Sequence, residues 1–147
     1  MAIKVSTGLR NAVLATSSLK SALSNGVLRI YAGAEPGSAD AAVNGATLLC
    51  EIFSDGSAAG INLANAAENG SISKAPGEAW SGSHIANGTA TWFRHVTLAD
   101  DGTASTAAMR IQGSVGVSGA DLNLSSVAFT MSTPQNIDYY TLTLPTY

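Results

Sequence analysis

The dipeptides Asn-Gly and Asp-Gly recur along the chain, and they limit the fold more than any other feature of the sequence. They begin at Asn25, Asn44, Asp55, Asn69, Asn87 and Asp101. These residue types adopt the positive φ angles that tight hairpin turns require. Between the dipeptides, apolar and polar residues alternate with a period of two, beginning at residues 27–31. The pattern predicts a mainly β protein whose short antiparallel strands form a β-sandwich of the jelly-roll or immunoglobulin-like kind.

The alternating segments give the expected positions of the strands. Strands are predicted over residues 27–32, 46–53, 88–97, 106–117, 124–132 and 136–144, with weaker ones near 60–63 and 78–85. Residues 33–45 are predicted to form a loop, because they contain the sequence Glu-Pro-Gly-Ser. Residues 54–77 show little periodicity and are rich in small and polar residues. They are expected to form a long surface excursion around one or two short strands, a kind of segment that is often functional.

One segment before the first strand has the helical period instead. Residues 7–24 are predicted to form a single helix, in which Ser6 or Thr7 caps the start and Asn25-Gly26 supplies the left-handed residues at the end. Its apolar stripe consists of Leu9, Val13, Leu19 and Leu23. The stripe is expected to pack on a sheet or on a partner subunit.

The length of 147 residues matches the size of one domain. The predicted organisation is a single β-sandwich domain over residues 1–147, with an N-terminal arm at 1–6, the helix at 7–24 and the sandwich at 27–144. The first residues lack the long apolar segment of a signal peptide, so the protein is expected to stay in the cytoplasm after synthesis. The single Cys50 lies in the apolar sequence Leu-Leu-Cys-Glu-Ile and is interpreted as a core thiol.

Charged residues make up only 12% of the chain, about half of their usual share. A polar but nearly uncharged surface has weak long-range repulsion and few flexible charged side chains to immobilise, which favours a protein that packs into an assembly. A neutral secreted or surface module is the alternative.

The net charge of −3 and the scattered basic residues argue against nucleic-acid binding. No apolar run approaches the roughly 18 residues that span a membrane, so no membrane partner is expected.

The residues that most often carry chemistry do not form a recognisable constellation. His84 and His95 flank a hairpin predicted to turn at Asn87-Gly88, but no third metal ligand lies within it. Asp100-Asp101 lacks the spacing of a calcium loop and is interpreted as a turn, although a weak structural cation stays an alternative. No nucleophile elbow or phosphate loop is present. The sequence therefore predicts no catalytic, cofactor-binding or metal site, and no enzyme.

Two tryptophans bracket the same predicted hairpin. Trp80 and Trp92 are interpreted first as core residues. If their rings are exposed, they are candidates for a carbohydrate platform, because aromatic faces stack on sugars. Trp92 beside Arg94 is also a candidate anchor for a neighbouring subunit, because Trp and Arg are enriched at interface hot spots.

Four segments carry a resemblance to a known class of proteins. They are Met-Ala-Ile-Lys-Val-Ser-Thr-Gly-Leu-Arg-Asn at residues 1–11, Gly-Thr-Ala-Thr-Trp-Phe-Arg at 88–94, Arg-Ile-Gln-Gly at 110–113 and Gly-Ala-Asp-Leu-Asn-Leu at 119–124. With these segments the chain resembles small virion proteins encoded by tailed phages and prophages of Gram-negative bacteria. The resemblance covers nearly the whole chain, but its motifs mark a family and not an activity.

The resemblance implies a β-sandwich subunit that decorates or cements the phage capsid and is located in the virion. The implied partners are the major capsid protein and further copies of the chain, with a trimer favoured as the oligomer. A tail, collar or baseplate component and a surface carbohydrate-binding module are the alternatives. Partner contacts are expected in residues 1–24, in the loop around 54–77 and at the C-terminal tyrosines, because the chain ends are apolar. The individual residues expected to contact partners are Ile3, Val5, Leu9, Trp80, Trp92, Tyr139, Tyr140 and Tyr147.

Overall fold

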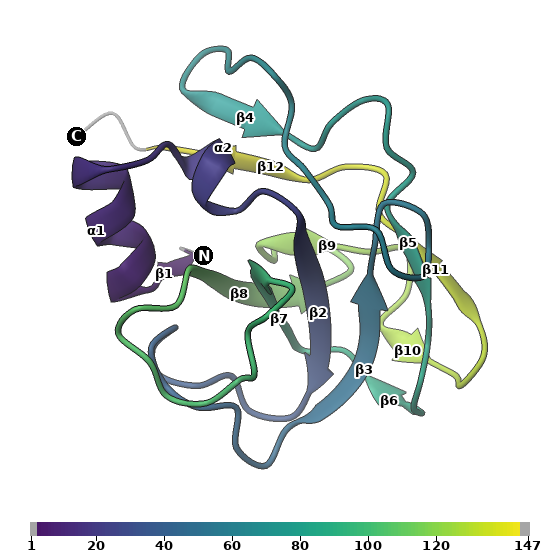
Figure 1. The fold of residues 1–147 in the computed structure, drawn as a ribbon. Coiled ribbons are helices and arrows are strands. Elements are labelled where there is room, and N and C mark those ends of the chain that lie inside the picture. Colours follow the sequence, from purple (N-terminus) through teal and green to yellow (C-terminus); the bar gives the residue numbers. More distant parts are fainter. Residues whose placement is uncertain (1–2, 145–147) are drawn as a thin grey trace.

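The computed structural model describes residues 3–144 and is dominated by one six-stranded sheet (Figure 1). Its strand order is β1 (Lys4–Val5), β8 (Arg110–Gly116), β7 (Trp92–Thr97), β2 (Gly26–Ala32) and β3 (Thr47–Ile52), all antiparallel, and β9 (Leu122–Asn123) pairs in parallel with β8. Three antiparallel pairs accompany it: β4 (Ser71–Ser73) with β12 (Thr141–Thr143), β5 (Ser81–Ser83) with β11 (Pro134–Asn136), and β6 (Gly88–Thr89) with β10 (Ala128–Phe129). The prediction of a mainly β, antiparallel protein is confirmed.

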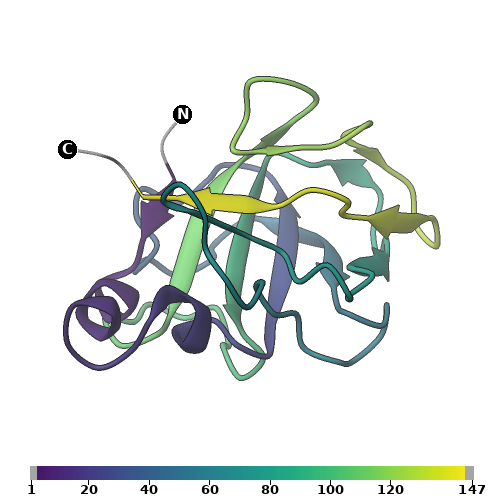
Figure 2. The ribbon, with the colours of Figure 1, turned by 90° about the horizontal axis from the view of Figure 1, so that it is seen from above.

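The main core lies between the large sheet and the three small pairs. Leu28 and Phe93 come from the sheet, whereas Phe129, Ile137 and Leu142 come from the pairs and their connections, and all belong to one buried cluster. Figure 2 shows β12 crossing over the strands of the large sheet instead of continuing it. The residues that extend inward from β12 and β10 therefore cover one face of the sheet.

The strands of the sheet are buried on both faces. On β2, Leu28 and Ile30 belong to the main core, and Tyr31 is buried on the opposite face, where it stacks on Trp92 of β7 with ring centroids 4.3 Å apart. The same alternation on β7 directs Phe93 toward the main core. A covering layer on the second face is therefore as necessary as the core on the first.

That second face carries a buried ion pair. Arg110 of β8 donates from Nε to Asp100 Oδ2 at 2.6 Å and from Nη2 to Asp100 Oδ1 at 3.1 Å, and both side chains are almost fully buried. The guanidinium also donates to the carbonyl oxygens of Ala39 at 3.1 Å and Thr103 at 2.6 Å. One side chain on the sheet thus holds two loops that are far apart in sequence.

Arg94 of β7 extends the same arrangement. Its Nε donates to Gln112 Oε1 at 2.7 Å, and its Nη2 donates to the carbonyl oxygen of Ala41 at 2.7 Å. Gln112 in turn donates to the carbonyl oxygen of Pro36 at 2.8 Å. Residues 33–46, which have no regular strand or helix, are therefore held on the sheet by side chains that satisfy their backbone acceptors, and the prediction of a loop at 33–45 is confirmed.

The N-terminal helix differs from its prediction. α1 (Thr7–Ala15) and α2 (Leu19–Ala22) are separate, so a single helix over residues 7–24 is wrong. Ser18 and Ser21 form a capping box, with each side chain bonded to the other residue's backbone N–H, and this local arrangement starts a new helix. The cap at Ser6 is confirmed, because its hydroxyl accepts from the Leu9 N–H.

Several strands are shorter than predicted, and one hairpin is wrong. The region 88–97 divides into β6 and β7, and 106–117 is extended only from Arg110 onward. The segments 124–132 and 136–144 contain only short strands, and 60–63 contributes isolated bridges. The hairpin predicted to turn at Asn87-Gly88 does not form, because β5 pairs with β11 whereas β7 pairs with β2 and β8. Long-range pairing replaces the local one.

Among the turn dipeptides, Asn69-Gly70 fits its prediction fully. Both residues have positive φ, 52° and 74°, and they join Glu68 to Ser71, which exchange backbone hydrogen bonds. This hairpin opens β4 inside the excursion at 54–77, where one or two short strands are predicted. The two-residue strands β1 and β9 lie outside every predicted strand, and β11 overlaps one only at Asn136, because strands this short do not show a period.

Gly8 provides a test of how closely α1 packs on the rest of the chain. A Cβ at this position would lie 2.4 Å from the Ala107 carbonyl oxygen. Alanine normally stabilises a helix relative to glycine by about 0.5–1 kcal/mol, but here the contact is with backbone that must move. We expect Gly8→Ala to lower the free energy of unfolding by about 1–3 kcal/mol in chemical denaturation. Gly37→Ala, where no atom lies within 4 Å, is the control and should have little effect.

Asp100 tests the buried ion pair. Asp100→Asn removes the countercharge of a buried guanidinium, and we expect a loss of about 3–5 kcal/mol in the free energy of unfolding. The matched variant is Asp101→Asn, because Asp101 is exposed and bonds only to Thr103 of its own turn among the described residues. Its expected change is within about 0.5 kcal/mol. Equal effects of the two variants in denaturation experiments would contradict the assignment.

Candidate docking groove

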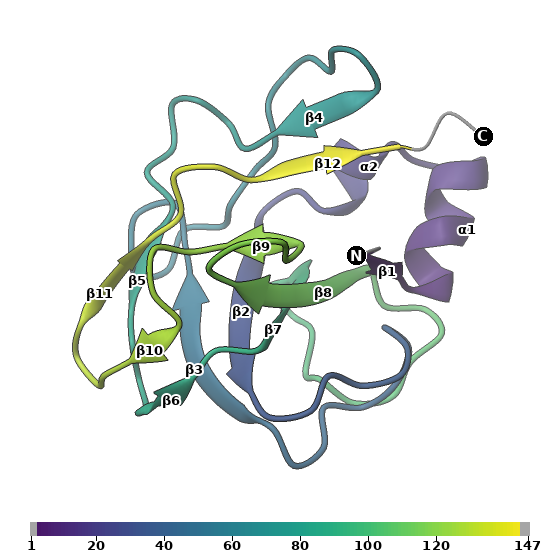
Figure 3. The ribbon, with the colours of Figure 1, turned by 180° about the vertical axis from the view of Figure 1, so that it is seen from behind.

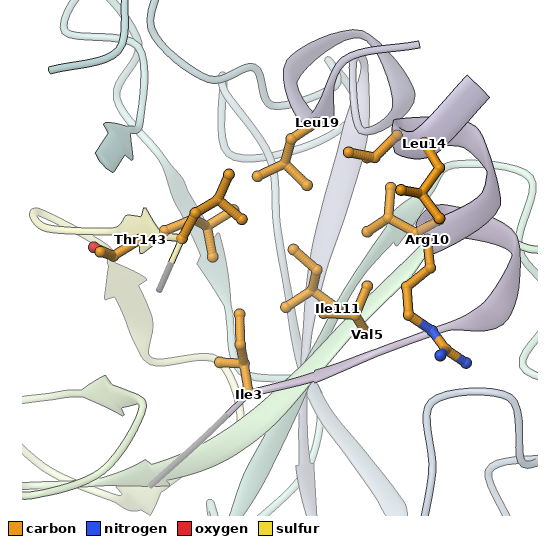
Figure 4. Close-up of a pocket in the computed structure, with 11 residues that line it drawn as sticks. Ile3, Val5, Arg10, Leu14, Leu19, Ile111 and Thr143 are labelled. Carbon is orange, nitrogen blue, oxygen red and sulfur yellow. The ribbon is translucent and has the colours of Figure 1, made fainter. Parts of the chain in front are cut away.

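An aliphatic groove of about 380 Å³ opens between α1, β1, β8 and β12 (Figure 4). Nine of its eleven lining residues are Leu, Ile or Val: Ile3, Val5, Leu9, Val13, Leu14, Leu19, Ile111, Leu142 and Leu144. The other two are Arg10 and Thr143. A surface of this composition binds by excluding water from apolar groups, so it is suited to an apolar partner and not to acid–base or nucleophilic chemistry.

The groove is assembled from the two ends of the described chain. Antiparallel pairing of β1 with β8 sets Val5 opposite Ile111, and the Ser6 cap then turns the chain into α1. β12 supplies the facing wall through Leu142 and the residues after it. Figure 3 shows α1, β1 and the end of β12 at the same side of the molecule.

The walls of the groove differ in how much they are exposed. Leu9 is fully buried and Ile111 is 1% exposed, so they form part of the floor. Leu14 and Leu144 are 84% and 65% exposed, so they form part of the rim. Full burial of an exposed leucine side chain is favourable by roughly 1.5–3 kcal/mol. A partner that covers the rim would therefore be bound with a contribution of this size from each leucine.

Arg10 is the charged residue among those that line the groove. Its Nη2 donates to Thr7 Oγ1 at 3.0 Å. Figure 4 shows the guanidinium pointing away from the other labelled side chains. Thr7 is itself fixed by Asp40, which accepts from the Thr7 N–H at 2.8 Å and from its hydroxyl at 2.6 Å. These bonds lower the pKa of Asp40 and join the start of α1 to the loop that covers the second face of the sheet.

The structure brings three of the expected partner-binding residues together in the groove, namely Ile3, Val5 and Leu9. Leu14 falls within the segment 1–24 that was expected to contact partners, although it was not named individually. Leu144 was not expected, because the wall that β12 contributes comes from the other end of the chain and no local sequence pattern records that contact. Tyr147 lies outside the described residues.

The remaining aromatic candidates are distributed differently. Tyr139 is 89% exposed and lies apart from the groove, whereas Trp80, Trp92 and Tyr140 are buried within the chain, where a partner does not reach them. Trp80 donates to Glu78 Oε1 at 2.8 Å and packs on Tyr140 with ring centroids 5.2 Å apart. The reading of both tryptophans as core residues is confirmed, and their burial removes the aromatic platform expected for carbohydrate binding.

The two histidines have separate environments, because the hairpin that was expected to bring them together does not form. His84 Nδ1 lies 3.2 Å from the Thr130 backbone nitrogen and 3.1 Å from the Thr130 carbonyl oxygen, and Nε2 lies 3.1 Å from Gln135 Oε1. The His84 ring stacks on Phe129 with ring centroids 3.8 Å apart. His95 lies in the main core with Nδ1 2.9 Å from the Tyr140 hydroxyl. No group of three His, Cys, Asp or Glu residues placed to hold a metal occurs within residues 3–144.

Two further predictions concern single groups. Cys50 is fully buried, and burial raises the pKa of its thiol to about 12, so its assignment as a core residue is confirmed. Asp100 and Asp101 lie in the loop at 98–109 that joins β7 to β8, so a tight hairpin turn at these residues is wrong, and Asp100 pairs with Arg110. No helix in the described part of the chain is long and apolar enough to cross a membrane.

Comparison with known proteins identifies no relative. No protein-family model, no curated protein and no solved structure matches the chain.

His95 makes the stability of the core dependent on pH. Complete burial lowers its pKa from 6.5 to about 4, so the unfolded chain takes up a proton at pH values where the folded chain does not. The stabilising effect is complete above about pH 6.5 and is lost as the pH falls toward 4, by up to about 3 kcal/mol. Urea denaturation between these values should show this slope, and it should be smaller in His95→Gln. An unchanged slope in the variant would assign the effect to other groups.

Proposed function

We propose that this chain is a non-catalytic structural subunit of a tailed-phage particle, and specifically a capsid decoration or cement protein. It is made in the cytoplasm of the host bacterium and incorporated into the virion, where it contacts further copies of itself and the major capsid protein. The observation that carries the proposal is the aliphatic groove, which leaves Leu14 and Leu144 largely exposed beside a buried floor. An aliphatic surface of this kind marks a contact with another protein chain.

The composition supports an assembly of many copies. With charged residues at 12% of the chain, the surface presents few groups that must be desolvated or immobilised when subunits pack. Each contact needs only a modest free energy, because simultaneous contacts around a particle multiply in effect. The resemblance of the terminal and central segments to small virion proteins directs the proposal to phage particles in particular.

The proposed architecture of the subunit is a distorted β-sandwich. In this arrangement the pairs β4–β12, β5–β11 and β6–β10 act together as the second layer over the large sheet. Core residues contributed from both sides, such as Leu28 and Leu142, support the description. The buried ion pair on the second face then makes the subunit a rigid body that presents the groove at one side.

A tail, collar or baseplate component would have the same surface and composition, so its copy number separates it from a decoration protein. The carbohydrate-binding alternative has lost its main support, because Trp80 and Trp92 are buried.

The direct test is the copy number of the chain in purified particles of the phage or prophage that encodes it. Quantitative mass spectrometry, normalised to the major capsid protein, should give a copy number comparable with that of the capsid protein. A far smaller number, similar to that of a tail or collar component, would move the chain to that location. Absence from the particles would overturn the proposal.

Leu14→Glu tests the groove itself. The side chain is exposed, so the substitution should leave the free energy of unfolding within about 0.5 kcal/mol, but it places a charge on an apolar contact surface. We expect the variant to be strongly depleted from purified particles. Val117→Glu is the matched control, because Val117 is 61% exposed and does not line the groove. Equal incorporation of the two variants would exclude the groove as the contact.

A further inference from the structure

The Asn-Gly dipeptides have a chemical reactivity as well as a preference for turns. The backbone nitrogen of the glycine can attack the side-chain carbonyl carbon of the asparagine, and glycine permits the close approach because it has no side chain. The chain contains this dipeptide at Asn25, Asn44, Asn69 and Asn87. As dipeptides the four are identical, so a difference in reactivity between them has to come from the fold.

The reaction needs freedom of the chain at the dipeptide. The glycine nitrogen must turn toward the asparagine side chain, close a five-membered ring with it and give up its proton. A hydrogen bond from the glycine N–H, a hydrogen bond to the asparagine amide, or a backbone fixed by its neighbours opposes this movement. A site held in one of these ways reacts only after local opening, and its rate falls with the population of the open state.

The large sheet holds Asn25-Gly26. The Gly26 N–H donates to the Ile61 carbonyl oxygen at 3.1 Å, and the Asn25 N–H donates to Asn62 Oδ1 at 3.0 Å. Gly26 is buried at the start of β2, where a Cβ would lie 2.6 Å from the Val96 carbonyl oxygen. The glycine nitrogen is therefore bonded, and the site has no room for a ring.

Tertiary contacts also hold Asn87-Gly88. Asn87 Oδ1 accepts from the Met131 N–H at 2.8 Å, which fixes the side-chain amide that would be attacked. Gly88 is paired with Phe129 between β6 and β10, and a Cβ on Gly88 would lie 3.0 Å from Leu49 Cδ2. The reaction would have to break this pairing.

The hairpin turn at Asn69-Gly70 is exposed, but its backbone is fixed. Glu68 and Ser71 exchange two hydrogen bonds of 2.9 Å across the turn. The Gly70 carbonyl oxygen also accepts from the Leu144 N–H at 2.9 Å. Rotation of the Gly70 nitrogen toward the asparagine side chain would disrupt these bonds, so the hairpin protects this site as well.

Asn44-Gly45 has none of these restraints within the described residues. Both residues are exposed, and neither the Asn44 side chain nor the Gly45 N–H forms a hydrogen bond with another described residue. A Cβ on Gly45 would have no atom within 4 Å apart from its chain neighbours, so there is space for a ring. Figure 1 shows the loop between β2 and β3, which contains this dipeptide, at the bottom of the view and outside the sheet.

We infer that Asn44 is a site of spontaneous deamidation in the folded protein. A bond forms between the Gly45 nitrogen and Asn44 Cγ, the bond from Cγ to Nδ2 breaks, and ammonia leaves with the proton from the Gly45 nitrogen. Water then adds to one of the two carbonyl carbons of the succinimide ring and opens it. The product at position 44 is aspartate or isoaspartate. The inference is independent of the proposed function.

The modification changes the loop that covers the second face of the sheet. It adds one negative charge to a chain whose net charge is −3. Val43, which precedes the site, donates from its N–H to the Gly102 carbonyl oxygen at 2.9 Å. The new carboxylate therefore lies on a segment that is bonded to the loop containing Asp101, and isoaspartate also lengthens the main chain next to this bond by one methylene group.

The test follows the four asparagines in the full-length protein during incubation at mildly alkaline pH, below the unfolding temperature. Peptide mapping by mass spectrometry measures the rate at each site, and circular dichroism shows that the chain stays folded. We expect Asn44 to react about tenfold faster or more than each other site, because reaction elsewhere requires the loss of one or two hydrogen bonds. In concentrated urea, where the fold is lost, the four rates should be of the same order.

Two variants test the assignment by isoelectric focusing. Asn44→Gln should remove the acidic species that accumulates in the unmodified protein, because the longer side chain closes a ring of six atoms much more slowly. Asn69→Gly is the matched variant, since it removes the other exposed dipeptide with a residue that adopts positive φ. It should accumulate the acidic species as fast as the unmodified protein does.

Several results would overturn the inference. Equal rates at the four sites of the folded chain would show that the fold does not select among them, and a faster reaction at Asn69 would show that the hairpin gives no protection. An Asn44 that stays intact in the folded chain while it reacts in urea would show that the loop is held after all. Continued accumulation of the acidic species in Asn44→Gln would assign the modification to another residue.

Discussion

The buried guanidinium groups of Arg94 and Arg110 are the constraint on which the rest of the structure depends. A sheet in this chain has one face for the apolar core, and its second face must be covered by loops that have little apolar surface of their own. The arginines solve this by donating to backbone carbonyl oxygens of residues 33–46 and 98–109, and Asp100 balances the charge of Arg110. Breaking such a pair is costly because an uncompensated charge would stay buried.

The same loops determine where the groove lies. Asp40, in the loop held by Arg94 and Arg110, bonds to Thr7 at the start of α1, and Gly8 contacts the backbone of Ala107. α1 is therefore fixed at the edge of the sheet by its first turn, and its last turn is left extending past the core. Leu14 is exposed for this reason, and β12 approaches from the other side to complete the groove.

The aliphatic groove is suited to contact with an apolar partner surface. Two buried titratable groups have partners within the fold: Arg110 pairs with Asp100, and His95 Nδ1 lies 2.9 Å from the Tyr140 hydroxyl. The proposed role as a virion subunit uses this groove. The lowered pKa of His95 makes the stability of the core sensitive to low pH.

The sequence by itself determined the β class, the loop at 33–45, the cap at Ser6 and the burial of Cys50, because each depends on local periodicity or on the chemistry of neighbouring residues. Only the tertiary structure decided the pairing of the strands, the division of the helix, the partners of Arg110 and the groove. These features join segments that are distant in the chain, and the free energy that selects among alternative pairings comes from burial and buried hydrogen bonds that no local pattern records. The short strands, such as β1, form because they can make backbone hydrogen bonds with the edge of a longer strand that is already part of a sheet.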